Sequence, residues 1–136
     1  MSQTQHADAM TEAQLEDWGL LALPLAEPLG GPMATRGLET WSSEDEKTST
    51  GIWECEPGPS QWKLDGEGEL IYVVRGRMTC TADDGTVTEV GPGDSMTFPP
   101  GWSGRWDIHE TLRKVYAIFP GEETGFDGVN ATGIDS

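Results

Sequence analysis

The chain has 136 residues, of which 35% are hydrophobic, so it supports one domain with one modest core. Its 8 Lys and Arg residues stand against 24 Asp and Glu residues, which gives a formal net charge of −16. A chain this acidic is not expected to bind nucleic acid or an anionic membrane surface. We interpret the acids as a solvated surface that keeps the protein soluble, with a salt-adapted host as the alternative.

The first 33 residues are expected to form an N-terminal arm outside the main fold. Residues 1–10 are small and polar without periodicity, which predicts disorder. Thr11 and Gln14 are spaced as a capping box, which predicts a short helix. Residues 20–32 are apolar but broken by Pro and Gly, so they should lie over the barrel or a neighbouring subunit. Their leucines would form an exposed apolar patch on a monomer, and we therefore expect a homodimer.

Residues 34–120 are predicted to form the folded domain. In residues 69–101, β-branched and aromatic runs are cut at Arg75-Gly76, at 83–85 and at 91–94, which predicts an antiparallel meander. Eight or more short strands with tight turns favour a jelly-roll β-barrel, because closure removes exposed strand edges. Further strands are expected at 36–41, 49–55, 61–65, after residue 101 and at 112–119, and residues 121–136 should be a flexible acidic tail.

The two cysteines, Cys55 and Cys80, both fall in predicted strands. The chain shows no signal peptide and no apolar run long enough to span a bilayer, so we expect a cytoplasmic protein. Buried free thiols are the leading interpretation, and a redox, metal or nucleophilic role is the alternative.

A family resemblance rests on Glu69, Gly76 and the phrases Pro92-Gly93-Asp94 and Pro99-Pro100-Gly101. Their spacing resembles the two sequence motifs of the cupin superfamily, and the similarity extends over residues 51–119. The chain is most similar to small single-domain cupins like the (S)-ureidoglycine aminohydrolase cupin domain. This resemblance implies an all-β jelly-roll barrel with an internal cavity.

The resemblance also implies where a metal site would lie. In similar cupins two histidines and a glutamate of the first motif join a histidine of the second motif around one metal ion. Carried onto this chain, the glutamate is Glu69, the first-motif histidines fall on Lys63 and Asp65, and the last ligand falls on Gly104. Only Glu69 keeps its ligand type, and His109 has the opposite strand parity and should point outward. We therefore expect no metal cofactor, although Asp65, Glu69 and a cysteine remain an alternative ligand set.

The two carboxylates suggest a different arrangement. Asp65 and Glu69 in one cavity would repel each other unless a positive charge lay between them. Lys63 is two residues from Asp65, so we hypothesise a Lys63–Asp65–Glu69 cluster at the barrel mouth that could perform acid–base chemistry. In the alternative, Lys63 extends into water and Asp65 belongs to the turn at Gly66.

Apolar residues are expected to line the cavity around these charges. Strand parity brings Ile71, Val73 and Trp106 to the same side as Glu69. The residues predicted to contact a ligand are Trp53, Trp62, Trp106, Tyr116, Ile71 and Val73, with core packing as the alternative for each tryptophan. Arg113 and Lys114 are expected at a sheet edge, one of them paired with an acid such as Glu110.

Two functions fit these features. The leading interpretation is a metal-free module that binds a small metabolite in the barrel. The alternative is a hydrolase, lyase or isomerase, similar to ureidoglycine aminohydrolase, that uses Glu69 and Lys63 as acid–base groups. A phosphate-binding loop, a serine or cysteine triad and zinc-type cysteine spacing are all missing from the sequence.

Overall fold

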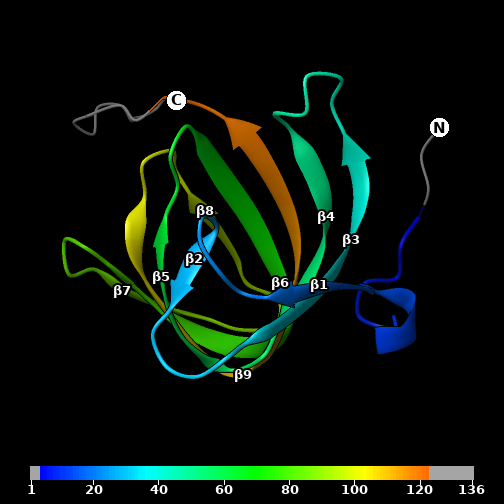
Figure 1. Ribbon diagram of the computed structural model, residues 1–136, viewed down its shortest axis with the longest axis horizontal. Helices are drawn as coiled ribbons and strands as arrows, with labels where there is room; N and C mark the ends of the chain where they lie inside the picture. The colour runs from blue at the N-terminus through cyan, green and yellow to red at the C-terminus, as the bar shows by residue number, and fades with distance from the viewer. Residues whose placement is uncertain (1–3, 123–136) are drawn as a thin grey trace.

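The computed structural model describes residues 4–122, and within them nine strands form one curled sheet (Figure 1). These residues contain no α-helix, and no helix among them is long and apolar enough to cross a membrane. The elements are a 3-10 turn η1 (Glu12–Gln14) and the strands β1 (Glu16–Leu20), β2 (Ala26–Pro28), β3 (Ala34–Ser42), β4 (Ser49–Cys55), β5 (Gly58–Lys63), β6 (Glu67–Ala82), β7 (Val87–Val90), β8 (Ser95–Phe98) and β9 (Ser103–Pro120).

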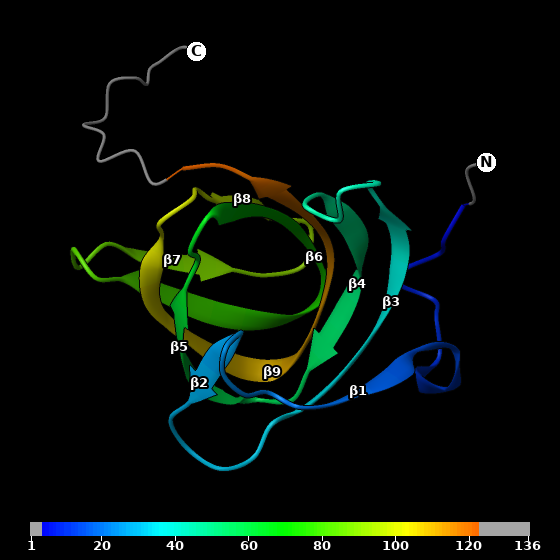
Figure 2. The ribbon, with the colours of Figure 1, turned by 45° about the horizontal axis from the view of Figure 1, so that its top comes forward.

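The long strand β9 lies at the centre of this sheet. One edge of β9 pairs with β6 along most of its length, and the other edge pairs first with β5 and then with β4. Beyond β4 come β3 and β1, beyond β5 comes β2, and β6 carries β7 and β8 on its far edge. The strands curve round a common interior, as expected for a jelly-roll barrel (Figure 2).

The predicted meander is confirmed at its turns near residues 83–85 and 91–94, but not at Arg75-Gly76. β6 runs through Gly76 as one strand with shifts of register against β9. Gly76 has a φ of 83°, and a Cβ atom there would lie 2.2 Å from the carbonyl oxygen of Thr111. The glycine therefore allows a bulge pressed against the neighbouring strand, where the sequence suggested a turn.

The N-terminal region differs from its prediction in being mostly extended. The expected helix is only the three-residue turn η1, preceded by Thr11, whose backbone N–H donates to Oε1 of Gln14 at 2.8 Å. The chain then enters β1, which pairs with β3, because the edge of β3 offers backbone partners that a short isolated helix lacks. Residues 4–10, for which the sequence predicts disorder, make turns that pack Met10 against Leu15 and Ile52.

The apolar segment after β1 lies along the barrel, with β2 paired to β5. Leu21 and Ala26 are buried, whereas Leu20, Leu23, Leu25 and Leu29 are exposed. The homodimer expected from these leucines stays a prediction. The predicted acidic tail lies outside the described residues from position 123 onward.

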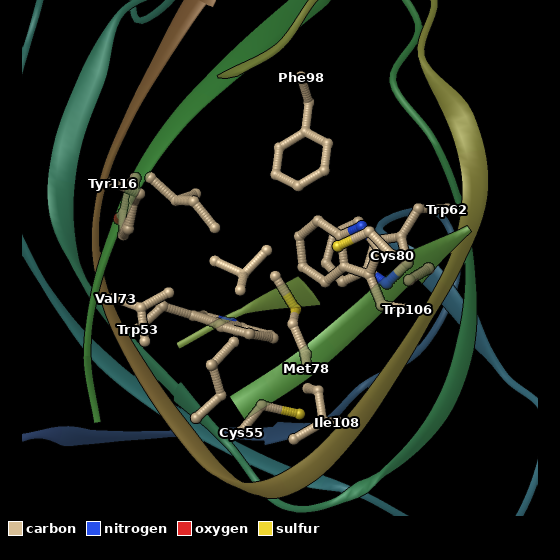
Figure 3. Close-up of a cluster of buried hydrophobic side chains, with 14 of the residues drawn as sticks. Trp53, Cys55, Trp62, Val73, Met78, Cys80, Phe98, Trp106, Ile108 and Tyr116 are labelled. Atoms are coloured by element: carbon tan, nitrogen blue, oxygen red, sulfur yellow. The ribbon is translucent and has the colours of Figure 1, made fainter. Parts of the chain in front are cut away.

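Aromatic side chains fill the barrel interior. Figure 3 shows Trp53, Trp62, Trp106 and Phe98 projecting into a common core. Trp62 and Trp106 stack with ring centroids 3.9 Å apart, and Trp53 meets Trp62 edge-on at 6.0 Å. Such contacts between large rings supply much of the apolar burial in a domain of this size.

Both cysteines are buried free thiols, as the sequence predicts. Burial raises the pKa of Cys55 and of Cys80 to about 12, so neither is ionised near neutral pH. We expect Ellman's reagent to label neither thiol in the native protein at pH 8 and both thiols after unfolding in guanidinium chloride. Rapid labelling of either cysteine in the folded protein would contradict this burial.

Candidate functional site

A pocket of about 100 Å³ opens into the barrel interior. Strands β4, β5, β6 and β9 form its inner wall, and residues of β1 and of the segment before β2 close one side of it. Its apolar lining is Trp18, Leu25, Trp53, Trp62, Leu64 and Ile118, and its polar lining is Glu67, Glu69, Lys114 and Tyr116. A mostly apolar cavity with a few convergent polar groups is typical of a small-molecule site.

The polar lining of the pocket includes a buried ion pair. Nζ of Lys114 on β9 donates to Oε2 of Glu69 on β6 at 2.7 Å. The lysine side chain is 3% exposed and the glutamate side chain 7% exposed. Each charge would be costly to bury alone, so the two groups depend on each other.

Indole rings surround the ammonium group of Lys114. Its Nζ lies 4.4 Å from the ring centroid of Trp53, 4.6 Å from that of Trp106 and 5.8 Å from that of Trp62. A cation above an indole face is attracted by the electrons of the ring, most strongly where water is excluded. The barrel therefore holds one fixed positive charge between a carboxylate and three tryptophans.

The structure brings some of the sequence-predicted residues into the pocket and leaves others out. Glu69, Trp53, Trp62 and Tyr116 line it. Ile71, Val73 and Trp106 belong to the core around it, and the indole N–H of Trp106 has no hydrogen-bond acceptor within residues 4–122. Lys63 and Asp65 lie at the surface, with side chains 45% and 78% exposed.

The hypothesised Lys63–Asp65–Glu69 cluster is not formed. Nζ of Lys63 lies 3.9 Å from Asp65 and donates to the carbonyl of Gly101, whereas Glu69 pairs with Lys114. β5 ends at Lys63 and a loop precedes β6, so the alternation of side chains along a strand does not bring Lys63 and Asp65 to the same side as Glu69. The buried Glu69 carboxylate is instead paired with the ammonium group of Lys114.

The predicted edge position of Lys114 is also wrong, because β9 is flanked by β4 and β6 at this point. Lys114 shares strand parity with Trp106 and Tyr116, which the sequence predicts to line the cavity, so the same alternation marks Lys114 as an inward-facing residue. Arg113 points to the opposite side, where it is 1% exposed and donates to Oε1 of Glu54 at 2.7 Å. Glu110 instead pairs with Arg77 at the surface.

The donors in the pocket do not fit the metal centre that the cupin motifs imply. Among residues 4–122 no three His, Cys, Asp or Glu side chains converge as metal ligands. A Cβ atom at Gly104 would lie 2.5 Å from the carbonyl oxygen of Thr81, so packing leaves no room for a ligand there. The indole ring of Trp102 also lies against that glycine. His109 is exposed and contacts Thr79 through a hydrogen bond of 2.7 Å.

Two further groups in the pocket have altered acidity. Burial, followed by the negative charge of Glu69, raises the pKa of Glu67. Burial, followed by the charges of Glu39 and Glu69, raises the pKa of Tyr116 to about 12. The phenol therefore stays neutral at physiological pH and can donate or accept a hydrogen bond.

Several solved structures share the fold. A protein of unknown function from Pseudomonas syringae pv. tomato superimposes with a TM-score of 0.66 at 17% identity over 82% of this chain, which spans only 45% of that protein. The EutQ protein of Clostridium difficile matches with a TM-score of 0.55 at 19% identity, covering 65% of this chain and 69% of EutQ. Ectoine synthase from P. lautus matches with a TM-score of 0.56 at 14% identity, over 63% of this chain and 64% of the enzyme. At these identities the likeness concerns the fold.

The family is shown by the sequence itself. No curated protein matches the chain in sequence. The model of the EutQ-like cupin domain, however, matches residues 42–116, which is just over half of the chain. The matched range includes β4 to β8 and most of β9, and so contains Glu69 and Lys114. The all-β barrel and this match agree, and the chain belongs to the EutQ-like cupin domain family.

Proposed function

We propose that the protein binds a small molecule in the barrel pocket, with the Lys114–Glu69 ion pair in the place that a ligated metal ion occupies in similar cupins. The observation that carries this proposal is the position of the pair, buried in the wall of a mostly apolar pocket. Glu69 is the one motif position that keeps its ligand type, and the ammonium group of Lys114 supplies its positive counterpart.

The size of the pocket limits the ligand. A volume of about 100 Å³ corresponds to roughly three water molecules at their share of liquid volume. A compound of a few non-hydrogen atoms, or one end of a larger metabolite, would fill it. The apolar walls would supply most of the binding energy, and the few polar groups would orient the compound.

Binding can be tested with a panel of small amines, carboxylates, alcohols and aromatic compounds, using calorimetry and the thermal shift of tag-free protein. A ligand that binds only the native state raises the melting temperature, and the stabilisation grows with the logarithm of 1 + [L]/Kd. We expect Ile118→Phe, which fills the pocket, to abolish the shift. Val87→Phe, at an exposed position of β7, should preserve it. The proposal would be contradicted if no compound of the panel bound, or if a compound that binds gave the same thermal shift with Ile118→Phe.

A metabolic enzyme is the second candidate, favoured by one observation. Glu67 and Glu69 are two carboxylates in one pocket, and the pKa of Glu67 is raised, as in many general acids. In that case Glu67 and Glu69, rather than the exposed Lys63, would be the acid–base groups. The specific likeness to ureidoglycine aminohydrolase rests on the sequence motifs alone. NMR can follow the compounds of the same panel for conversion to a product. Product formation would favour this candidate if Glu67→Gln reduced it while the protein still bound the compound.

A further inference from the structure

The pocket carries an excess of negative charge. Glu67 and Glu69 contribute two carboxylates and Lys114 one ammonium group, so carboxylates outnumber cations in the lining. Lys114 is held at 2.7 Å from Glu69 and so neutralises that carboxylate. Within residues 4–122 the side chain of Glu67 has no ion-pair partner of its own.

The surroundings of Glu67 disfavour its ionised form. Glu67 is half-buried on β6 and lines the same pocket as the Glu69 carboxylate, so its charge is partly withdrawn from water and repelled by a neighbour of the same sign. A positively charged ligand would remove this penalty. A negatively charged ligand would increase it, and would also have to compete with Glu69 for Lys114.

The walls of the pocket also favour a positively charged ligand. Three tryptophans, Trp18, Trp53 and Trp62, line it. Nε1 of Trp18 donates to Glu16 at 3.2 Å, which fixes one edge of that ring at the rim. The ammonium of Lys114, 4.4 Å from the Trp53 centroid, shows that indoles of this barrel already hold a cation.

From these observations we propose that the pocket selects a small organic cation, an ammonium group on a short apolar body. The ammonium group binds beside Glu67, and the apolar body lies against Trp18 and Trp62. This inference rests on the proposed function, because it names the chemical class of that pocket's ligand.

The test compares three small probes that differ in charge: n-butylammonium, n-pentanol and pentanoate. The last two are one chain atom longer than n-butylammonium, so apolar contact alone would favour them. Titration calorimetry at pH 7.5 and fixed ionic strength measures each affinity. We expect n-butylammonium to bind about tenfold more tightly than n-pentanol, with pentanoate weakest. Glu67→Gln should lower the n-butylammonium affinity to about that of n-pentanol and leave n-pentanol unchanged.

A matched variant separates the pocket charge from the overall charge of the protein. Glu27→Gln removes one exposed carboxylate of β2 that does not line the pocket, and it should leave all three affinities unchanged. Equal or tighter binding of n-pentanol or pentanoate would overturn the cation preference while leaving the pocket as a ligand site. The cation preference would also be overturned if Glu27→Gln and Glu67→Gln lowered the n-butylammonium affinity equally. Absence of binding by all three probes would overturn the preference, and the proposed function would fall with it only if the wider panel of compounds also gave no binder.

Discussion

Lys114→Met is expected to lower the free energy of unfolding by about 3–5 kcal/mol, because it leaves the Glu69 carboxylate buried without its cation. Methionine keeps the length of the lysine stem, so the loss reports the charge rather than a cavity. The contacts between the ammonium group and the three indoles are lost as well. Guanidinium chloride denaturation followed by tryptophan fluorescence measures the effect.

Two companion variants make this result specific to the ion pair. Lys114→Met combined with Glu69→Gln removes both charges and should recover most of the lost stability, because the remaining groups are neutral. Lys63→Met alters only an exposed lysine and should cost less than about 1 kcal/mol. If Lys114→Met were no more destabilising than Lys63→Met, the buried pair would not contribute as we describe.

The second large effect is expected at Arg113, on the opposite side of β9. Its guanidinium group donates to Glu54 and to the backbone carbonyls of Ala7 and Met10, at 2.9 and 2.6 Å. We expect Arg113→Met to lower the free energy of unfolding by about 3 kcal/mol, because Glu54 and two carbonyl groups lose a buried donor. Hydrogen exchange should also become faster in residues 7–14, which this contact holds against the barrel.

Arg77 provides the matched control for this prediction. It forms one ion pair with Glu110, and both side chains are more than half exposed. Arg77→Met should therefore cost less than about 1 kcal/mol and leave hydrogen exchange in residues 7–14 unchanged. Similar losses for Arg77→Met and Arg113→Met, or unchanged exchange in Arg113→Met, would mean that the arm is held by other contacts.

Much of the barrel follows from local features of the sequence. The alternation of apolar residues predicts that Glu69, Ile71 and Val73 share one face of a strand, and all three are buried in β6. The predicted strand at 49–55 has the same bounds as β4. These features depend on neighbours in the chain, which the sequence shows directly.

The partner of Glu69 depends on pairing between distant strands. The alternation of side chains along a strand identifies the inward positions of β9 but not the strands that flank it. The sequence alone therefore favours a sheet edge for Lys114. A lysine is rarely buried without a partner, and its carboxylate lies 45 positions away in the chain. The burial of Arg113 is harder still to predict from the sequence, because the N-terminal segment that contacts it lies more than 100 positions earlier.

Membership of the EutQ-like cupin domain family accounts for the fold of the chain, while its activity depends on the groups in the pocket. In this barrel the positions that would carry histidine ligands are occupied by surface residues and by a packed glycine. The charge that remains at the motif glutamate is balanced by lysine. A cavity of this kind suits recognition of a small ligand by shape, indole faces and charge.

The most direct test of this account is elemental analysis by mass spectrometry of tag-free protein, after incubation with manganese, iron, nickel or zinc and dialysis. Because Lys114 already provides the cation beside Glu69, we predict far less than one equivalent of each metal. Lys114→Met combined with Glu69→Gln should give the same result. About one equivalent of metal in the natural protein, lost in that double variant, would show that Glu69 is a metal ligand and would contradict the central claim.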